Sequence, residues 1–254
     1  RRSGLVEPGP MAASAGSGAQ KRSKKRMDGR WRLLLARLGL AAAILAGAVL
    51  VSIVLFRFVN PPITATMVVD KLRGGTLHRQ WVPLEKISPN LQLAVIASED
   101  GNFCDHRGVD WGAVREVINK AKSLKAVRGA STIPMQVAKN LYLWERRNYV
   151  RKALEVPLAY AMTTLWPKRR MLEVYLNIAQ WGPHTYGAEA ASRRYFGKPA
   201  SRLTRRQAVL LAAALPNPHA RNPARPNRKM RLIASAVQRR LPYISKRADC
   251  VLKP

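Results

Sequence analysis

The longest apolar stretch of the chain runs from Leu38 to Phe56 and contains no charged residue. As a helix, these residues would rise about 28 Å, which is close to the hydrocarbon thickness of a bilayer. The pattern therefore predicts a membrane-spanning helix over residues 38–59. The alternative is a cleaved signal peptide, but its apolar region is normally shorter and ends at a small-residue cleavage site.

Basic residues cluster on the N-terminal side of this segment, between Lys21 and Arg37. The positive-inside rule places the N-terminus in the cytoplasm and residues 60–254 across the membrane. The first twenty residues are rich in Gly, Ala, Ser and Pro and show no periodicity. We therefore expect residues 1–37 to be a disordered, basic cytoplasmic tail.

Beyond Val69, apolar residues recur at helical spacing, and almost none alternate with the period of a strand. Leu91, Ala94 and Val95 mark the buried face of a helix that opens at Ser88 and Pro89. We expect a helix capped by Asp110 and further helices over residues 144–166, 168–179 and 188–195. A Thr204–Gln207 capping box predicts another helix, and the last one runs from Met230 to Leu241. The one predicted strand is the β-branched run Thr64–Val69. The fold class is mainly α.

Charge is the most unusual feature of the composition. The 254 residues include 45 Lys and Arg against 14 Asp and Glu, for a formal net charge of +31. Because 34 of the basic residues and 12 of the acidic ones follow Asn60, the predicted domain is itself strongly basic. The charge indicates an anionic, phosphate-rich partner.

The chain has two cysteines, Cys104 and Cys250. A disulfide between them would tie the centre of the chain to its C-terminal end. We expect the two thiols to be unpaired instead, as small buried apolar groups. No spacing of His or Cys residues predicts a structural metal site.

Two carboxylates, Glu99 and Asp100, stand where the first predicted helix of the domain ends. Glu99 follows Val95 by four residues and so continues the buried face of that helix. Partial burial raises the pKa of a carboxylate, which makes it a better proton acceptor near neutral pH. Spacing alone favours the alternative that both are solvated charges at a helix end.

A cationic segment follows the loop RGASTIPMQVAKNL. The loop enters a helix N-terminus and offers hydroxyls and backbone N–H groups to an anion. Arg147, Arg151 and Glu155 then lie four residues apart on one helical face. A solvated, salt-bridged face has the same spacing, but the nearby loop favours an anion site. Pro157 predicts a kink or a new helix start.

Four motifs occur in order: E-D-x-x-F-x-x-H-x-G, G-A-S-T-I-P-M-Q-V-A-K-N-L, R-K-A-L-E and L-E-V-Y-L-N. Together they resemble the glycosyltransferase family 51 peptidoglycan polymerases. The printed chain lacks S-x-x-K with K-T-G, so the similarity is to the monofunctional members, which are inner-membrane enzymes of Gram-negative bacteria. The resemblance implies a lysozyme-like glycosyltransferase domain over residues 60–254 in the periplasm, with a membrane-dipping region near residues 112–127.

The resemblance also implies the reaction, which is polymerisation of lipid II into β-1,4 glycan strands with inversion and release of undecaprenyl diphosphate. Glu99 matches the catalytic base and Glu155 the second glutamate, which orients cations or assists the leaving group. The residues that match the donor diphosphate site are Ser131, Gln136, Lys139, Arg147 and Arg151. Those that support the motifs are Asp100, Phe103, His106, Gly108 and Lys152; we assign Asp100 and His106 to holding the loop. One Gln of the family's usual pair is replaced by Met135.

The expected partners are lipid II, the growing glycan strand, membrane lipid and a cell-wall synthesis complex, with no nucleic acid. No cofactor is expected to be required, although a divalent cation such as Mg²⁺ stimulates some family members. Two other functions remain open. A lytic transglycosylase or muramidase would cleave glycans with the same fold and would need an acid for the bridging oxygen. A non-enzymatic, membrane-anchored binder of anionic ligands would explain the charge alone.

Overall fold

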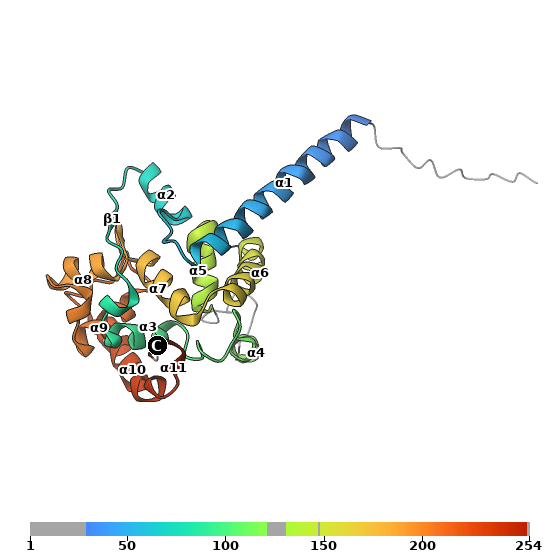
Figure 1. The fold of residues 1–254 in the computed structure, drawn as a ribbon. Coiled ribbons are helices and arrows are strands. Elements are labelled where there is room, and N and C mark those ends of the chain that lie inside the picture. Colours follow the sequence, from blue (N-terminus) through green and yellow to red (C-terminus); the bar gives the residue numbers. More distant parts are fainter. Residues whose placement is uncertain (1–28, 121–130, 147, 253–254) are drawn as a thin grey trace, which may run out of the picture. The chain divides into compact units, whose positions relative to one another are not determined.

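The computed structural model describes residues 29–120, 131–146 and 148–252 of the chain (Figure 1). The chain divides into two compact units, Arg1–Leu45 and Ala46–Pro254, so that the boundary falls within the first helix. The second unit contains all the predicted site residues that the structure describes.

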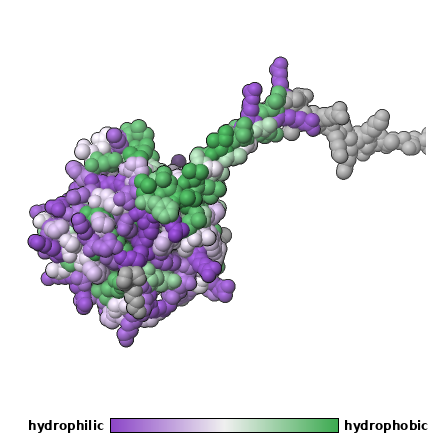
Figure 2. Space-filling model, viewed as in Figure 1, coloured by the Kyte–Doolittle hydropathy of each residue, from purple (hydrophilic) through white to green (hydrophobic). Residues whose placement is uncertain are grey.

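The apolar N-terminal segment forms helix α1, Gly29–Phe56. It is the one helix of the described residues that is long and apolar enough to span a membrane. Figure 2 shows its hydrophobic surface, with charged residues only toward its N-terminal end. Helix α1 includes residues 29–37, which we had assigned to the disordered tail, and it ends three residues before the predicted boundary at residue 59.

The last turns of α1 belong to the second unit and pack against it. Ile53 is fully buried, and its carbonyl oxygen accepts a hydrogen bond of 2.8 Å from the indole of Trp166. The carbonyl oxygen of Phe56 accepts another, of 3.0 Å, from Arg170. These contacts join the end of the apolar helix to the domain that follows it.

The predicted strand Thr64–Val69 is wrong. The segment forms helix α2, Ala65–Leu72, and the Thr64 side chain caps it by accepting a bond of 3.3 Å from the Met67 N–H. Burial of Thr66 and Met67 on one face of this short helix outweighs the β preference of its branched residues.

The domain is mainly helical, as predicted. Its longer helices are α3 Pro89–Glu99, α4 Trp111–Lys120, α5 Ile133–Tyr142, α6 Tyr149–Leu165, α7 Lys168–Ile178, α8 Ala188–Phe196, α9 Arg205–Ala214 and α10 Arg228–Ser245. The short elements are η1 Leu84–Lys86, η3 Ala200–Arg202, α11 Asp249–Leu252, and the strands β1 His78–Arg79, β2 Gln180–Gly182 and β3 Thr185–Tyr186. The strands form a sheet in the order β1-β3-β2, in which β3 is parallel to β1 and antiparallel to β2.

Helix α3 lies at the centre of the core. It packs against α9 and α10, while α5 packs against α6 and α7 (Figure 1). Leu91, Ala94 and Val95 are fully buried, as their spacing predicted. Each large apolar side chain buried in this way contributes about 1.5–3 kcal/mol. The end of α3, and with it Glu99, is thereby held in a fixed position.

The predicted helix starts are largely confirmed. Asp110 accepts a bond of 2.9 Å from the Ala113 N–H, and Thr204 and Gln207 form the capping box of α9. Ser88 precedes α3 but does not cap it, because its hydroxyl donates to the Leu203 carbonyl oxygen instead. Pro157 lies inside α6, which neither ends nor begins there.

The expectation of unpaired thiols is wrong, because Cys104 and Cys250 form a disulfide. Their Cα atoms are 5.8 Å apart. Helix α11 packs against α7 and thereby brings Cys250 to the loop that follows Glu99. This proximity depends on tertiary packing between residues 146 positions apart, which spacing in the sequence does not reveal.

Candidate active site

Glu99 is the last residue of α3, and hydrogen bonds hold both of its carboxylate oxygens. Oε1 accepts a bond of 2.9 Å from the Ser98 hydroxyl, and Oε2 accepts one of 3.0 Å from the Gln136 amide. The Gln136 side chain accepts in turn from the Tyr175 hydroxyl at 2.9 Å. Burial raises the pKa of Glu99, although its two hydrogen bonds and Lys139 act in the opposite direction.

Asp100 has a different environment from its neighbour. Its side chain contacts His106 Nε2 at 2.8 Å, and it accepts a bond of 2.8 Å from the Ile133 N–H at the start of α5. Both side chains are almost fully buried. These contacts link the loop to α5, which is the holding position that we predicted for Asp100 and His106.

The other residues of the first motif also support this loop. Phe103 is buried, and Lys168 donates to the carbonyl oxygens of Phe103 and His106. Gly108 has a φ of +100°, and a Cβ there would lie 3.0 Å from the carbonyl carbon and oxygen of Ala159. Any larger residue at position 108 would meet both backbone strain and α6.

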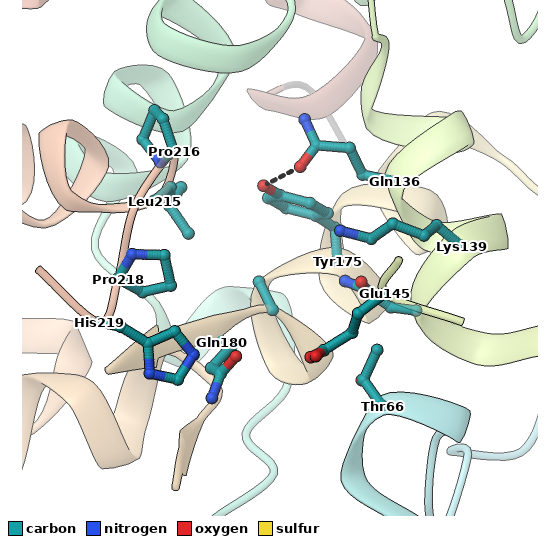
Figure 3. Close-up of a pocket in the computed structure, with 12 residues that line it drawn as sticks. Thr66, Gln136, Lys139, Glu145, Tyr175, Gln180, Leu215, Pro216, Pro218 and His219 are labelled. Atoms are coloured by element: carbon teal, nitrogen blue, oxygen red, sulfur yellow. Dashed lines mark hydrogen bonds between the residues drawn. The ribbon is translucent and has the colours of Figure 1, made fainter. Parts of the chain in front are cut away.

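Two pockets lie beside the Glu99–Gln136 hydrogen bond, since Gln136 lines the first and Glu99 lines the second. The first has a volume of about 240 Å³, and Figure 3 shows Gln136 and Lys139 on one side of it and Pro216, Pro218 and His219 on the other. The second has a volume of about 450 Å³, and its lining includes Ser98, Glu99, Asn102, Glu116, Arg240 and Tyr243. A group in either pocket therefore lies close to the same buried pair of side chains.

Lys139 is the predicted cation that lines the first pocket. It lies on α5 three residues after Gln136, and among the described residues it forms no ion pair. Burial lowers the pKa of Lys139, and the positive charge of Arg151 lowers it further. Its ammonium group is available to an anion in this pocket.

The second glutamate lies in a cluster on α6. Glu155 is 3% exposed and accepts from Arg151 and, at 3.0 Å, from Lys152. Lys152 also donates to the Ser131 hydroxyl at 2.7 Å. Ser131, Arg151, Lys152 and Glu155 are thus brought together, with the carboxylate between two cations. Arg147 lies outside the described residues.

Sequence reasoning did not assign a role to Tyr175, which lies in the L-E-V-Y-L-N motif. It is 1% exposed, and burial raises its pKa well above the ordinary value, so its hydroxyl stays a donor. It also missed Ser98 and the pocket residues Gln180, His219, Arg240 and Tyr243. The signal for Tyr175 was its place in the L-E-V-Y-L-N motif.

The described residues contain no group of three or more His, Cys, Asp or Glu side chains that could hold a metal ion. The cations described above are the positive charges that this site offers to an anion.

A family model described as transglycosylase matches residues 66–244. The chain belongs to the transglycosylase family. This membership agrees with the resemblance given by the motifs, and it confirms the predicted fold class of a mainly α, lysozyme-like domain preceded by one apolar helix.

Several relatives of this transglycosylase are similar over most of their length. A protein of Agrobacterium fabrum is 48% identical over 191 residues, which cover 75% of this chain and 84% of the relative. One of Rhodospirillum centenum is 45% identical over 219 residues, covering 84% and 95%. One of Pasteurella multocida is 46% identical over 202 residues, covering 77% and 82%. All three are named biosynthetic peptidoglycan transglycosylase.

Proposed function

We propose that this transglycosylase polymerises lipid II into β-1,4 glycan strands and releases undecaprenyl diphosphate, with Glu99 as the general base. The observation that carries the proposal is the position of Glu99. Its carboxylate is held by two donors beside two pockets, and one of those pockets is lined by Lys139, whose ammonium group has no ion-pair partner within residues 29–120, 131–146 and 148–252. The similarity to relatives named biosynthetic peptidoglycan transglycosylase supports the substrate class.

The proposed reaction is a single displacement. The 4-hydroxyl of the acceptor sugar loses its proton to Glu99 as its oxygen attacks the anomeric carbon of the donor strand. A bond forms between that oxygen and the carbon, and the bond from the carbon to the diphosphate oxygen breaks. The electron pair leaves with the diphosphate, and the configuration of the carbon inverts. The raised pKa of Glu99 favours this proton transfer.

The departing diphosphate needs positive charge. Lys139 is proposed to bind it together with Arg147 and Arg151, with Ser131 and Gln136 as polar neighbours. Glu155 already accepts hydrogen bonds from Arg151 and Lys152. We therefore assign Glu155 to the positioning of those cations, which is one of the two roles expected for it from the sequence.

The proposed location is the bacterial inner membrane, with α1 as a single span, the N-terminus in the cytoplasm and the catalytic domain in the periplasm. The apolar surface of α1 supports membrane anchoring. The Cys104–Cys250 disulfide supports an oxidising compartment for the domain, because disulfides persist there and are rare in the cytosol. Membrane lipid and a cell-wall synthesis complex are the proposed partners beside the substrate. No cofactor is proposed to be required.

The test uses detergent-solubilised full-length protein and fluorescently labelled lipid II. We expect polymer and released diphospholipid from the wild type, and none from Glu99→Gln, because the amide keeps the shape of the side chain but cannot accept the proton. Glu85→Gln is the matched control, because Glu85 is exposed and pairs with Arg169 at the surface. Polymerisation by Glu99→Gln near the wild-type rate would refute the assignment of the base.

The same assay separates the other two functions. A lytic enzyme would shorten preformed glycan strands and leave lipid II unused. A binder of anionic ligands would bind lipid II without consuming it. Either result with the wild-type protein would overturn the proposed polymerisation.

A further inference from the structure

The C-terminal part of the domain carries a concentration of positive charge that the proposed reaction does not use. Residues 197–252 contain thirteen Lys and Arg but a single acidic residue, Asp249. Most of these cations lie on or beside α9 and α10, and the two helices pack against each other and against α3. The face therefore stands next to the helix that bears Glu99.

The cations of α10 are not spread evenly around the helix. The buried stripe is formed by Met230, Ala234, Val237, Leu241 and Ile244. With 3.6 residues per turn, four of the five cations on α10 fall within a sector of about 120° beside that stripe, and two more follow directly after its last residue. The four are Arg228, Lys229, Arg239 and Arg240, and we call this sector, together with Lys246 and Arg247 just after it, the cationic face. Only Arg231 lies outside it.

Few of these cations are neutralised within the protein. Arg247 pairs with Asp105, and Arg240 donates to the Ala97 carbonyl oxygen at 3.3 Å. In the described part of the chain, the side chains of Arg228, Lys229, Arg239 and Lys246 form no ion pair or hydrogen bond. Like charges on neighbouring turns lie within a Debye length of one another and repel, so the face gains from an anionic ligand.

The cationic face is continuous with the Glu99 pocket. Arg240 and Tyr243 line that pocket, and both belong to the face. The Tyr243 side chain is 54% exposed, and the Arg247 guanidinium lies 5.0 Å from the centre of its ring. Tyr243 thus offers a flat apolar surface with a polar tip, against which a sugar ring can pack.

We propose that the cationic face of α10 binds the glycan strand where the strand meets the Glu99 pocket, through the carboxylates of its stem peptides. This inference rests on the proposed function, because it assigns a path to the polymer of that reaction. Peptidoglycan strands carry peptide carboxylates at regular intervals, and each arginine offers five N–H donors and no acceptor. A row of cations along one helix matches such a strand better than it matches a single small anion.

A bilayer is the competing anionic surface, and the distribution of apolar residues disfavours it. A membrane-binding helix combines cations with large exposed apolar side chains. Among the described residues, α10 exposes only Leu232 and Tyr243 of this kind. Val68 and Leu72 of α2 and Tyr149, Val150 and Leu154 of α6 are exposed elsewhere on the domain.

The experiment measures binding of fluorescently labelled, uncross-linked glycan strands to the full-length protein in detergent at low salt. Strands that carry their stem peptides are compared with strands from which an amidase has removed the peptides. The test variant is Lys229→Glu/Arg239→Glu. The control is Lys71→Glu/Lys86→Glu, which makes the same charge change at two exposed lysines outside residues 197–252. Thermal melting checks that both variants fold.

We expect the Lys229→Glu/Arg239→Glu variant to bind peptide-bearing strands about tenfold more weakly, which corresponds to two exposed charge pairs. The control should stay within about twofold of wild type on the same grounds, and stripped strands should bind weakly to every protein. The variant should also make shorter polymer from lipid II. Equal binding of peptide-bearing and stripped strands, or wild-type binding by the variant, would overturn the inference. The inference would also be overturned if the Lys229→Glu/Arg239→Glu variant lost its binding to anionic phospholipid vesicles but kept its binding to glycan strands. A wild type that makes no polymer would instead refute the proposed function.

Discussion

Removal of the disulfide is expected to destabilise the domain around its candidate base. The bridge joins the loop after Glu99 to α11, across 146 positions of sequence. The perturbation is the double substitution Cys104→Ser/Cys250→Ser in the full chain, which replaces each sulfur with a smaller hydroxyl. Without the bridge, α11 and the loop are held to each other only by noncovalent contacts.

The magnitude follows from the length of the closed loop. For a loop of this length, the chain-entropy relation gives about 5 kcal/mol of stabilisation, and native disulfides usually give about 2–4 kcal/mol. The contacts that remain include the buried Val251 side chain, worth about 1.5–3 kcal/mol, the hydrogen bond from Arg169 to the Val251 carbonyl oxygen, and the exposed Arg247–Asp105 pair, worth at most about 1 kcal/mol. We therefore expect the free energy of unfolding to fall by about 2–4 kcal/mol.

The assay is urea unfolding in detergent, followed by tryptophan fluorescence. The wild type, the wild type with a reductant and the double variant are compared, and the last two should unfold at similarly lowered urea concentrations. A variant within about 0.5 kcal/mol of the wild type would refute the reasoning, because that is the range of a neutral surface change. Reaction of the unreduced wild type with a thiol reagent would also refute it.

Three further predictions concern Glu99 and its neighbours. Tyr175→Phe removes the donor that orients Gln136, so kcat should fall about fivefold for one lost hydrogen bond. The control is Tyr195→Phe, which loses a comparable bond to the Trp181 carbonyl oxygen and should leave kcat unchanged. The value of kcat/KM should decline as pH falls through the raised pKa of Glu99. Because the Gln136 amide lowers the pKa of Glu99, Gln136→Leu should move this decline to higher pH, and a move to lower pH would contradict the prediction. Lys139→Met should reduce the rate of lipid II turnover about 100-fold, whereas Lys139→Arg should retain part of the wild-type rate. Equal rates in the two variants would refute the assignment of Lys139 to the diphosphate site.

The sequence predicted the fold well where one helix face determines burial. Leu91, Ala94 and Val95 are all buried, because a period of 3.6 residues places them on one side of α3. It failed at residues 64–69, where a Thr64 cap and the burial of Met67 decide in favour of a helix. Local propensity is a weak signal in such a short segment, and tertiary contacts override it.

The candidate site was predictable in part. The motifs supplied Glu99, Gln136, Lys139 and Glu155. The side chains of Glu99, Gln136 and Glu155 form hydrogen bonds in the site, and Lys139 lines the first pocket. Tyr175 belongs to the L-E-V-Y-L-N motif, but the role of its hydroxyl could not be identified, because a tyrosine on an inward helical face has the same pattern whether its hydroxyl is used or not. Residues far apart in sequence, such as Arg240 beside Glu99, are brought together only by the packing of α10 on α3.

The two donors to Glu99 differ in whether they can reverse their direction. The Gln136 amide nitrogen can only donate, and the Tyr175 hydroxyl keeps the amide from turning over. The Ser98 hydroxyl can rotate, because the Ala212 carbonyl oxygen lies 3.3 Å away as a second acceptor. As the proposed base, Glu99 therefore receives the proton on Oε1. The Ser98 hydroxyl then points its own hydrogen at the Ala212 carbonyl oxygen, and its oxygen accepts a hydrogen bond from the protonated Oε1. The carboxylate thus has one oxygen for anchoring and one for chemistry.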